Sequence, residues 1–208
     1  CISGKGSEQT GTIGTDGAFF LFSPEYLLEL YVKRPEAVRR GYLHMLLHCL
    51  YLHLFREDQE DRRLWNLACD IAVEQIISRE KIPILETGGD AKKIREKVFH
   101  ILGDRSDSAE TICRKLKEQA FPFHLEELEE AFHFDDHTLW DTCTGEKGKR
   151  TKEKWNKLLS YTAANRQDHR KRRGSQKGDQ KEETGTVRSG RYDYKKFVRQ
   201  FSVLREEV

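Results

Sequence analysis

The feature that most constrains the fold is an almost wholly apolar stretch, residues 41–55, with the sequence GYLHMLLHCLYLHLF. Pro35 and Glu36 precede it and are typical of a helix start, so we predict one helix over about residues 36–55. Between Leu43 and Leu50 this helix is apolar on all sides. Such a helix is expected at the centre of a domain, where other elements cover it.

Two histidines interrupt this helix four residues apart. Side chains at that spacing lie one turn above each other on one face, so His44 and His48 can direct their imidazoles at one point. This arrangement is typical of a zinc site, which needs at least a third protein ligand. The alternative is a pair of core histidines whose ring nitrogens are satisfied by hydrogen bonds.

The leading third ligand is Asp70, which lies in the middle of a helix predicted over residues 62–79. Apolar residues surround it, and burying a carboxylate there is costly unless it is paired or binds a metal. Asn66 and Glu74 lie four residues to either side and extend a narrow polar stripe. Two neighbouring buried helices that each carry such a stripe are expected to turn the stripes toward each other.

Two further histidine-bearing stretches have open interpretations. On an ideal helix His53 lies opposite His44, so it becomes a ligand only if the helix ends first, and we favour a role in capping or in supporting a ligand. Residues 133–140, HFDDHTLW, place His133, Asp135, Asp136 and His137 close together. They could form a second metal site or complete the first. Closely spaced Asp and His residues are common in turns, which favours a capped polar turn packed by Trp140.

The remaining pattern predicts an α+β protein that is predominantly helical. Residues 18–22, AFFLF, are typical of a short strand, and helices are predicted over about 24–33, 91–102, 108–119, 124–132 and 151–166. Hydrophobic residues make up 37% of the chain, enough for one core, and no apolar run is long enough to span a membrane. The five cysteines form no CxxC pair, which indicates reduced thiols and a cytoplasmic protein.

The chain divides into three parts by composition. We predict a domain over residues 1–166, a charged flexible linker over 167–190, and a helix over 191–208 that leads toward a C-terminal domain absent from this chain. Residues 166–181 are basic and could contact nucleic-acid phosphates. They lack interleaved aromatic residues and are interrupted by acids, which favours a solvated linker.

The ordered motifs TDGAFFLF, YLHMLLHCLYLHLF, LWNLACDIAVEQII, FDDHTLW and DYKKFVRQFSVLREE resemble a bacterial metallopeptidase family that has a C-terminal von Willebrand A-like domain. The resemblance implies a zincin-like fold, with a small sheet beside a central buried active-site helix, and a zinc ion. It also implies that GAFFLF is an edge strand able to pair with an extended peptide. Implied partners are a MoxR-type AAA+ ATPase or a peptide or protein substrate.

One position departs from the family's H-E-x-x-H motif, because Met45 stands where the glutamate is expected. That glutamate is the general base, and a thioether cannot accept a proton. Sequence offers four substitutes without placing any of them: Asp16, Glu74, Asp135 and Asp136. We therefore assign no catalytic residue and expect weak or no peptidase activity. The alternative is a non-catalytic interaction module that works with the ATPase through the absent domain.

Overall fold

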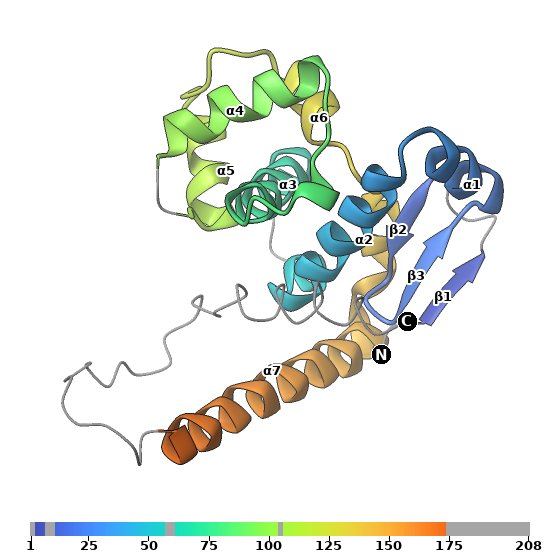
Figure 1. The fold of residues 1–208 in the computed structure, drawn as a ribbon, viewed down its shortest axis with the longest axis vertical. Coiled ribbons are helices and arrows are strands. Elements are labelled where there is room, and N and C mark those ends of the chain that lie inside the picture. Colours follow the sequence, from blue (N-terminus) through green and yellow to red (C-terminus); the bar gives the residue numbers. More distant parts are fainter. Residues whose placement is uncertain (1–2, 7–10, 57–60, 104–105, 174–208) are drawn as a thin grey trace. The chain divides into compact units, whose positions relative to one another are not determined.

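The computed structural model describes residues 3–6, 11–56, 61–103 and 106–173. Within them the chain is mostly helical with one small sheet, which confirms the α+β prediction. Figure 1 shows the sheet and α2 at one side of α3, with α4, α5 and α6 around α3. The chain forms two compact units, residues 1–162 and 163–208, and all side chains discussed below belong to the first.

The sheet has three strands in the order β1-β3-β2. Strand β1 (Ser3–Gly6) runs parallel to β3 (Phe19–Phe22), and β2 (Ile13–Thr15) pairs with β3 on the other side in antiparallel register. Gly17, with φ +79°, forms the tight connection between β2 and β3, where a side chain would be strained. The prediction that residues 17–22 supply a free edge is wrong, because both edges of β3 are paired.

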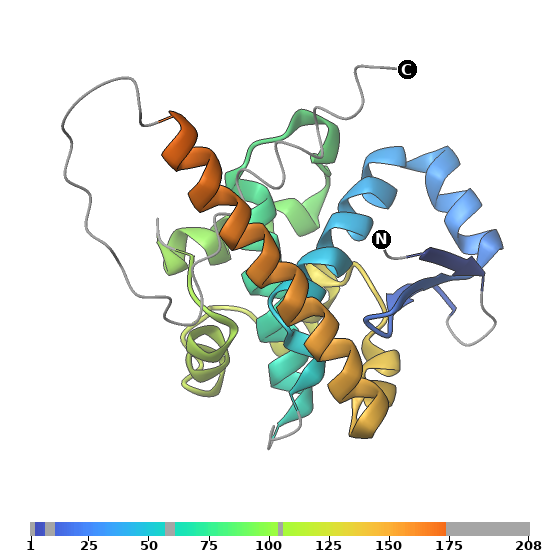
Figure 2. The same cartoon turned by 90° about the horizontal axis from the view of Figure 1, so that it is seen from below.

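Helix α1 (Pro24–Lys33) begins where its sequence predicts. Ser23 is the N-cap, and its Oγ accepts a hydrogen bond from the Tyr26 N–H. Helix α2 (Pro35–Leu50) follows, and every residue from Leu43 to Cys49 is buried, as the apolar pattern predicts. It contacts β2 on one side and α3 on the other, which places it at the centre of the first unit (Figure 2).

The prediction that this helix continues to residue 55 is wrong. Leu52 has φ 60° and ψ 25°, a left-handed conformation that an α-helix cannot contain, and a short 3-10 helix η1 (His53–Phe55) follows. The reversal at Leu52 changes the direction of the chain. It brings His53 back toward His48, although the two residues would lie apart on a continuous helix.

Helix α3 (Arg62–Arg79) has the predicted bounds, with Asp61 as its N-cap. It packs against α2, α5 and α6. Twelve of its residues are buried, including two carboxylates, Asp70 and Glu74. The other elements around α3 include the helices α4 (Asp90–Leu102), α5 (Ala109–Lys117) and α6 (Leu125–Phe132), which lie close to their predicted bounds. The 3-10 helix η2 (Pro83–Leu85), for which no element was predicted, precedes α4.

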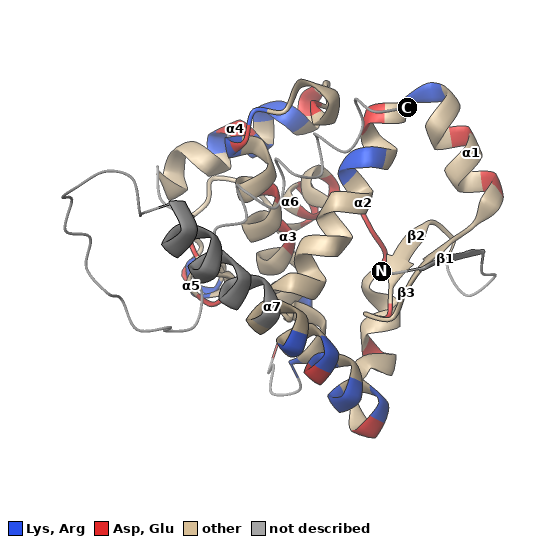
Figure 3. Ribbon diagram, turned by 60° about the horizontal axis from the view of Figure 1, so that its bottom comes forward, with Lys and Arg blue, Asp and Glu red and all other residues tan. Residues whose placement is uncertain are grey.

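The last described elements are the 3-10 helix η3 (His137–Cys143) and α7 (Gly145–Arg173). Helix α7 is longer than predicted at both ends and includes the first residues of the predicted linker. Lys and Arg residues are concentrated in its first turns (Figure 3). The rest of the linker and the helix predicted over 191–208 lie outside the described residues. Among the described helices, none is both long and apolar enough to cross a membrane.

Candidate metal centre

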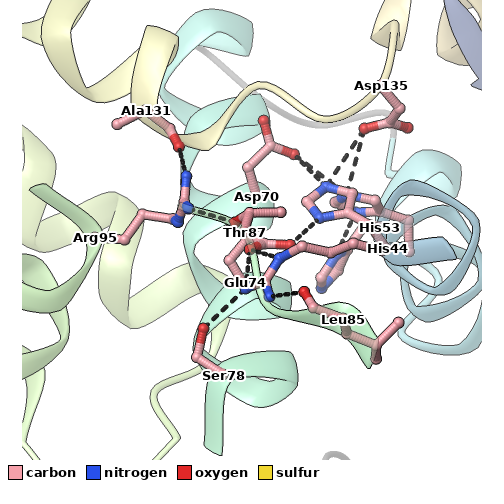
Figure 4. Close-up of polar contacts among 12 residues, drawn as sticks. His44, His53, Asp70, Glu74, Ser78, Leu85, Thr87, Arg95, Ala131 and Asp135 are labelled. Carbon is pink, nitrogen blue, oxygen red and sulfur yellow. Dashed lines mark hydrogen bonds and ion pairs between the residues drawn. The ribbon is translucent and has the colours of Figure 1, made fainter. Parts of the chain in front are cut away.

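Five side chains converge at the junction of α2, α3 and the turn before η3. They are His44, His48, Asp70, Asp135 and His137, and one ligand atom from each lies within 4.8 Å of all the others. All are buried except His137, which is nearly so. Figure 4 shows Asp70 and Asp135 approaching the imidazoles from two sides. A cluster of this kind, sequestered from water, is not a solvated surface charge group.

One carboxylate oxygen faces three imidazoles. Asp70 Oδ1 lies 3.3 Å from His44 Nε2, 3.2 Å from His48 Nε2 and 3.1 Å from His137 Nε2. Asp135 Oδ1 lies 3.1 Å from His137 Nε2 and 3.4 Å from His44 Nε2. The same nitrogen of each histidine, Nε2, therefore points to a common centre. That is the nitrogen and the convergence that a metal ion requires.

The turn that carries Asp135 and His137 is attached to the sheet. The Asp136 N–H donates to the Ile13 carbonyl at 2.7 Å, and Gly14 forms an isolated β-bridge with Asp136. On the other side, the His137 ring stacks on Trp140 with centroids 3.8 Å apart. The backbone contacts and the stacking thus position both side chains.

A buried ion pair orients His44 through Nδ1, the ring nitrogen that does not face the cluster. Its Nδ1 donates to Glu74 Oε1 at 2.9 Å, and Glu74 Oε2 accepts from Arg40 Nε at 2.7 Å. Because a carboxylate only accepts, the proton of the neutral ring is on Nδ1 and the lone pair is on Nε2. Glu74 thereby fixes both the tautomer and the direction of the ring, as carboxylates behind metal-binding histidines do.

His48 is oriented by His53. Their Nδ1 atoms lie 3.0 Å apart, close enough for one to donate to the other, and the Trp65 indole N–H donates to the His53 carbonyl. His53 is therefore a support of His48 and contributes no atom to the cluster. Its supporting position depends on the reversed backbone at Leu52.

The charged groups of the cluster shift one another's pKa values. Burial lowers the pKa of His137, but Asp70 and Asp135 outweigh it and raise the pKa to about 10. Burial also lowers the pKa of His44, yet its hydrogen-bonded carboxylates raise the pKa well above the usual value. For His48, burial and the charge on His44 lower the pKa to about 4. The neighbouring histidines hold the pKa of both aspartates below the usual value despite burial.

The two aspartates draw positive charge to the centre, and a divalent cation there would compete with protons for the same histidine nitrogens. Two buried atoms, His48 Nε2 and Asp135 Oδ2, have no aligned hydrogen-bond partner among the described residues. Since unsatisfied buried polar atoms are rare, both observations fit a bound cation.

The structure brings the predicted set His44, His48 and Asp70 together. It adds Asp135 and His137, for which the sequence left a capped turn and a metal site as alternatives. The Asp136 carboxylate caps η3 by accepting from the Thr138 N–H, and its two neighbours lie in the cluster that could hold a metal ion. His133, the other histidine of that turn, is exposed and outside the cluster.

The four carboxylates considered as replacement bases occupy other roles. Asp16 accepts from two backbone N–H groups of the turn before β3, and Asp136 caps η3. Both oxygens of Glu74 are engaged, by His44 and by Arg40. Asp135 belongs to the cluster itself. Met45 is buried, at 4% exposure, and its thioether can neither bind a proton nor release one.

The fold and the cluster define a mostly helical α+β protein with a buried histidine–carboxylate centre of the kind that binds a transition metal. Comparison of sequences gives the family. The chain belongs to the family described as "putative metallopeptidase domain", whose sequence model matches residues 3–195. No curated protein and no solved structure matches the chain.

Proposed function

We propose that this protein is a zinc-binding, zincin-like domain in which peptide hydrolysis is weak or absent. His44, His48 and Asp70 are the metal ligands, and Asp135 and His137 complete the donor set. The observation that carries the proposal is the convergence of three Nε2 atoms and two carboxylate oxygens within 4.8 Å. Membership in the metallopeptidase family supports it.

Zinc is the metal that this donor set favours. Three imidazoles with two carboxylates match the nitrogen and oxygen ligands of biological zinc sites, and no thiol takes part. In such a site zinc supplies Lewis-acid polarisation of a carbonyl group. The chain's own residues contribute the tautomer of His44 through Glu74, the support of His48 through His53, and the exclusion of water by burial.

Two features argue against efficient hydrolysis. The first is Met45, which removes the general base of the motif. The second is the number of donors. Catalytic zinc sites keep a position open for water or substrate, whereas structural sites are closed by four protein ligands. With five donor atoms in reach, the centre is closed unless a donor withdraws.

A second candidate function, a non-catalytic interaction module, is favoured by that same closed donor set. In it the metal centre stabilises a domain that presents the chain to a MoxR-type AAA+ ATPase through a von Willebrand A-like domain. We place the protein in the cytoplasm, where the four buried cysteine thiols of the described residues stay reduced.

Metal content tests the proposal directly. Protein prepared without a histidine tag should contain about one equivalent of zinc by elemental mass spectrometry, with iron, manganese and nickel measured in the same run. The variant with both His44→Ala and His48→Ala should contain none. A matched control, His100→Ala with His124→Ala, alters two exposed histidines and should keep the metal. Parent protein that stays free of metal after zinc is added back would overturn the proposal.

Metal affinity should also depend on Gly14, which touches no ligand. A Cβ at Gly14 would lie 2.7 Å from the Asp136 carbonyl oxygen and 3.1 Å from Leu139 Cδ1, so the turn carrying Asp135 and His137 must move. We expect Gly14→Ala to weaken zinc binding roughly 10–100-fold, as the loss of support behind metal ligands does. Competition with a chromophoric chelator measures it. Gly11→Ala, where nothing lies within 4 Å, is the control. Equal affinities in the two variants would show that the turn does not contribute.

A further inference from the structure

A cavity that no histidine lines lies between α3, η2 and α4. Its volume is about 390 Å³, within the range of small-molecule sites. Its cationic lining consists of Arg40, Arg79, Lys81, Lys92 and Arg95, while the acidic lining is limited to Glu86 and Glu96. The metal proposal uses none of these side chains as a ligand.

Arg95 is a buried cation without a paired anion. It is 5% exposed, and its guanidinium donates to the Ala131 carbonyl at 2.7 Å and to Thr87 Oγ1 at 2.8 Å. Both acceptors are neutral, as Figure 4 shows, and no carboxylate of the described residues makes an ion pair with it. Arg40, in contrast, has the Glu74 carboxylate at 2.6 Å. Glu74 and Glu96 attract the Arg95 charge without forming an ion pair, and the guanidinium carbon lies 5.3 Å from the centroid of the Phe134 ring. A buried cation with no carboxylate in contact is costly, so an anion in the cavity would complement Arg95.

Gln75 supplies an unpaired donor in the same cavity. The side chain is 1% exposed, and its Oε1 accepts from the Asp107 N–H at 3.1 Å. That bond fixes the orientation of the amide. The backbone N–H needs an acceptor, and within the side-chain amide the oxygen accepts whereas the NH₂ group only donates. The Nε2 group is therefore directed elsewhere and has no hydrogen-bond partner among the described residues. Buried NH₂ groups almost always donate a hydrogen bond, so an acceptor bound in the cavity would satisfy this one.

The charges at the rim favour an anionic acceptor over a neutral one. Glu74 neutralises Arg40, and Glu86 pairs with Lys92 at 3.2 Å. The remaining charged residues of the lining are three cations and one anion, namely Arg79, Lys81, Arg95 and Glu96. The positive potential would attract anions into the cavity, and Arg95 and Gln75 offer donors at its wall.

We propose that this cavity binds a small anionic ligand, whose phosphate or carboxylate oxygens accept hydrogen bonds from Arg95 and Gln75. The proposal does not depend on the metal centre, so metal-free protein can be used to test it. The volume admits a ligand larger than a bare ion, such as a phosphorylated or polycarboxylic metabolite.

The test measures binding of inorganic phosphate and of citrate to the full chain by titration calorimetry, in an amine buffer with ionic strength held constant by sodium chloride. One of the two anions should bind with saturable 1:1 stoichiometry, and the difference between them identifies the preferred group. The key variant is Gln75→Glu. It keeps the acceptor for the Asp107 N–H but replaces the unpaired donor with a carboxylate, which supplies the missing negative charge internally.

We expect Gln75→Glu to weaken anion binding roughly tenfold or more, through a lost hydrogen bond and added repulsion. Its thermal midpoint without ligand should not fall, which separates lost binding from lost structure. Lys81→Gln, at the rim, should also weaken binding, whereas Lys93→Gln, an exposed residue of α4 outside the lining, should not. Absence of saturable binding in the parent, or unchanged affinity in Gln75→Glu, would overturn the proposal.

Discussion

Removing the metal should lower the thermal unfolding midpoint of this protein by roughly 6–16 °C. A ligand present at 100 to 1,000 times its dissociation constant stabilises the folded state by about 3–4 kcal/mol. For a domain of this size each kcal/mol moves the midpoint by about 2–4 °C. The structural reason is that α2, α3 and the segment with Asp135 and His137 each supply donors to the cluster, so an ion held there would link the three.

Scanning calorimetry before and after dialysis against a chelator measures this effect, and added zinc should restore the midpoint. The control is the variant with both His44→Ala and His48→Ala, whose midpoint should respond neither to chelator nor to zinc. An unchanged midpoint in parent protein that has demonstrably lost its zinc would show that the centre does not stabilise the fold.

The second large effect concerns position 45. Introducing a general base by Met45→Glu should raise peptide hydrolysis roughly 10²–10⁴-fold, the usual contribution of such a group, provided that a coordination position is open. Because five donors would close the centre, we expect the gain in a background with both Asp135→Ala and His137→Ala, which leaves His44, His48 and Asp70, and little gain in the otherwise unchanged chain. Hydrolysis of a quenched fluorescent casein substrate gives the rates.

Met45→Gln is the matched control, since it has nearly the same shape as the glutamate variant but cannot take up a proton. Met45 is buried, so a glutamate there is tolerated only if it faces a positive charge, and a folded, zinc-loaded Met45→Glu variant would itself support that geometry. Equal rates for the glutamate and glutamine variants would show that a missing base does not limit activity. Efficient hydrolysis by the parent chain would overturn the proposed inactivity.

Sequence periodicity predicted the elements that depend on local pattern. The bounds of α3 follow from its cap and apolar stripe, and the burial of α2 follows from its uniformly apolar surface. Asp70 could be identified because a carboxylate among apolar residues needs a partner. In each case the informative residues lie within one or two turns of one another.

The rest depends on contacts between distant segments. No local signal places Leu52 in the left-handed conformation, so the end of α2 and the position of His53 were not predictable. The β1–β3 pairing, which removes the free edge of β3, joins parallel strands that β2 separates in the sequence, and no local pattern specifies it. For Asp135 and His137, the FDDH spacing was a usable signal, but only the bridge between Gly14 and Asp136 aims them at the helices.

The bridge between Gly14 and Asp136 also implies an order of assembly. His44, His48 and Asp70 lie on consecutive helices, so a short loop brings them together, whereas Asp135 and His137 come from far along the chain and dock only after β2 has formed. Closing the longer loop costs more chain entropy and comes later. The five donors would therefore be complete only once the longer of the two loops has closed.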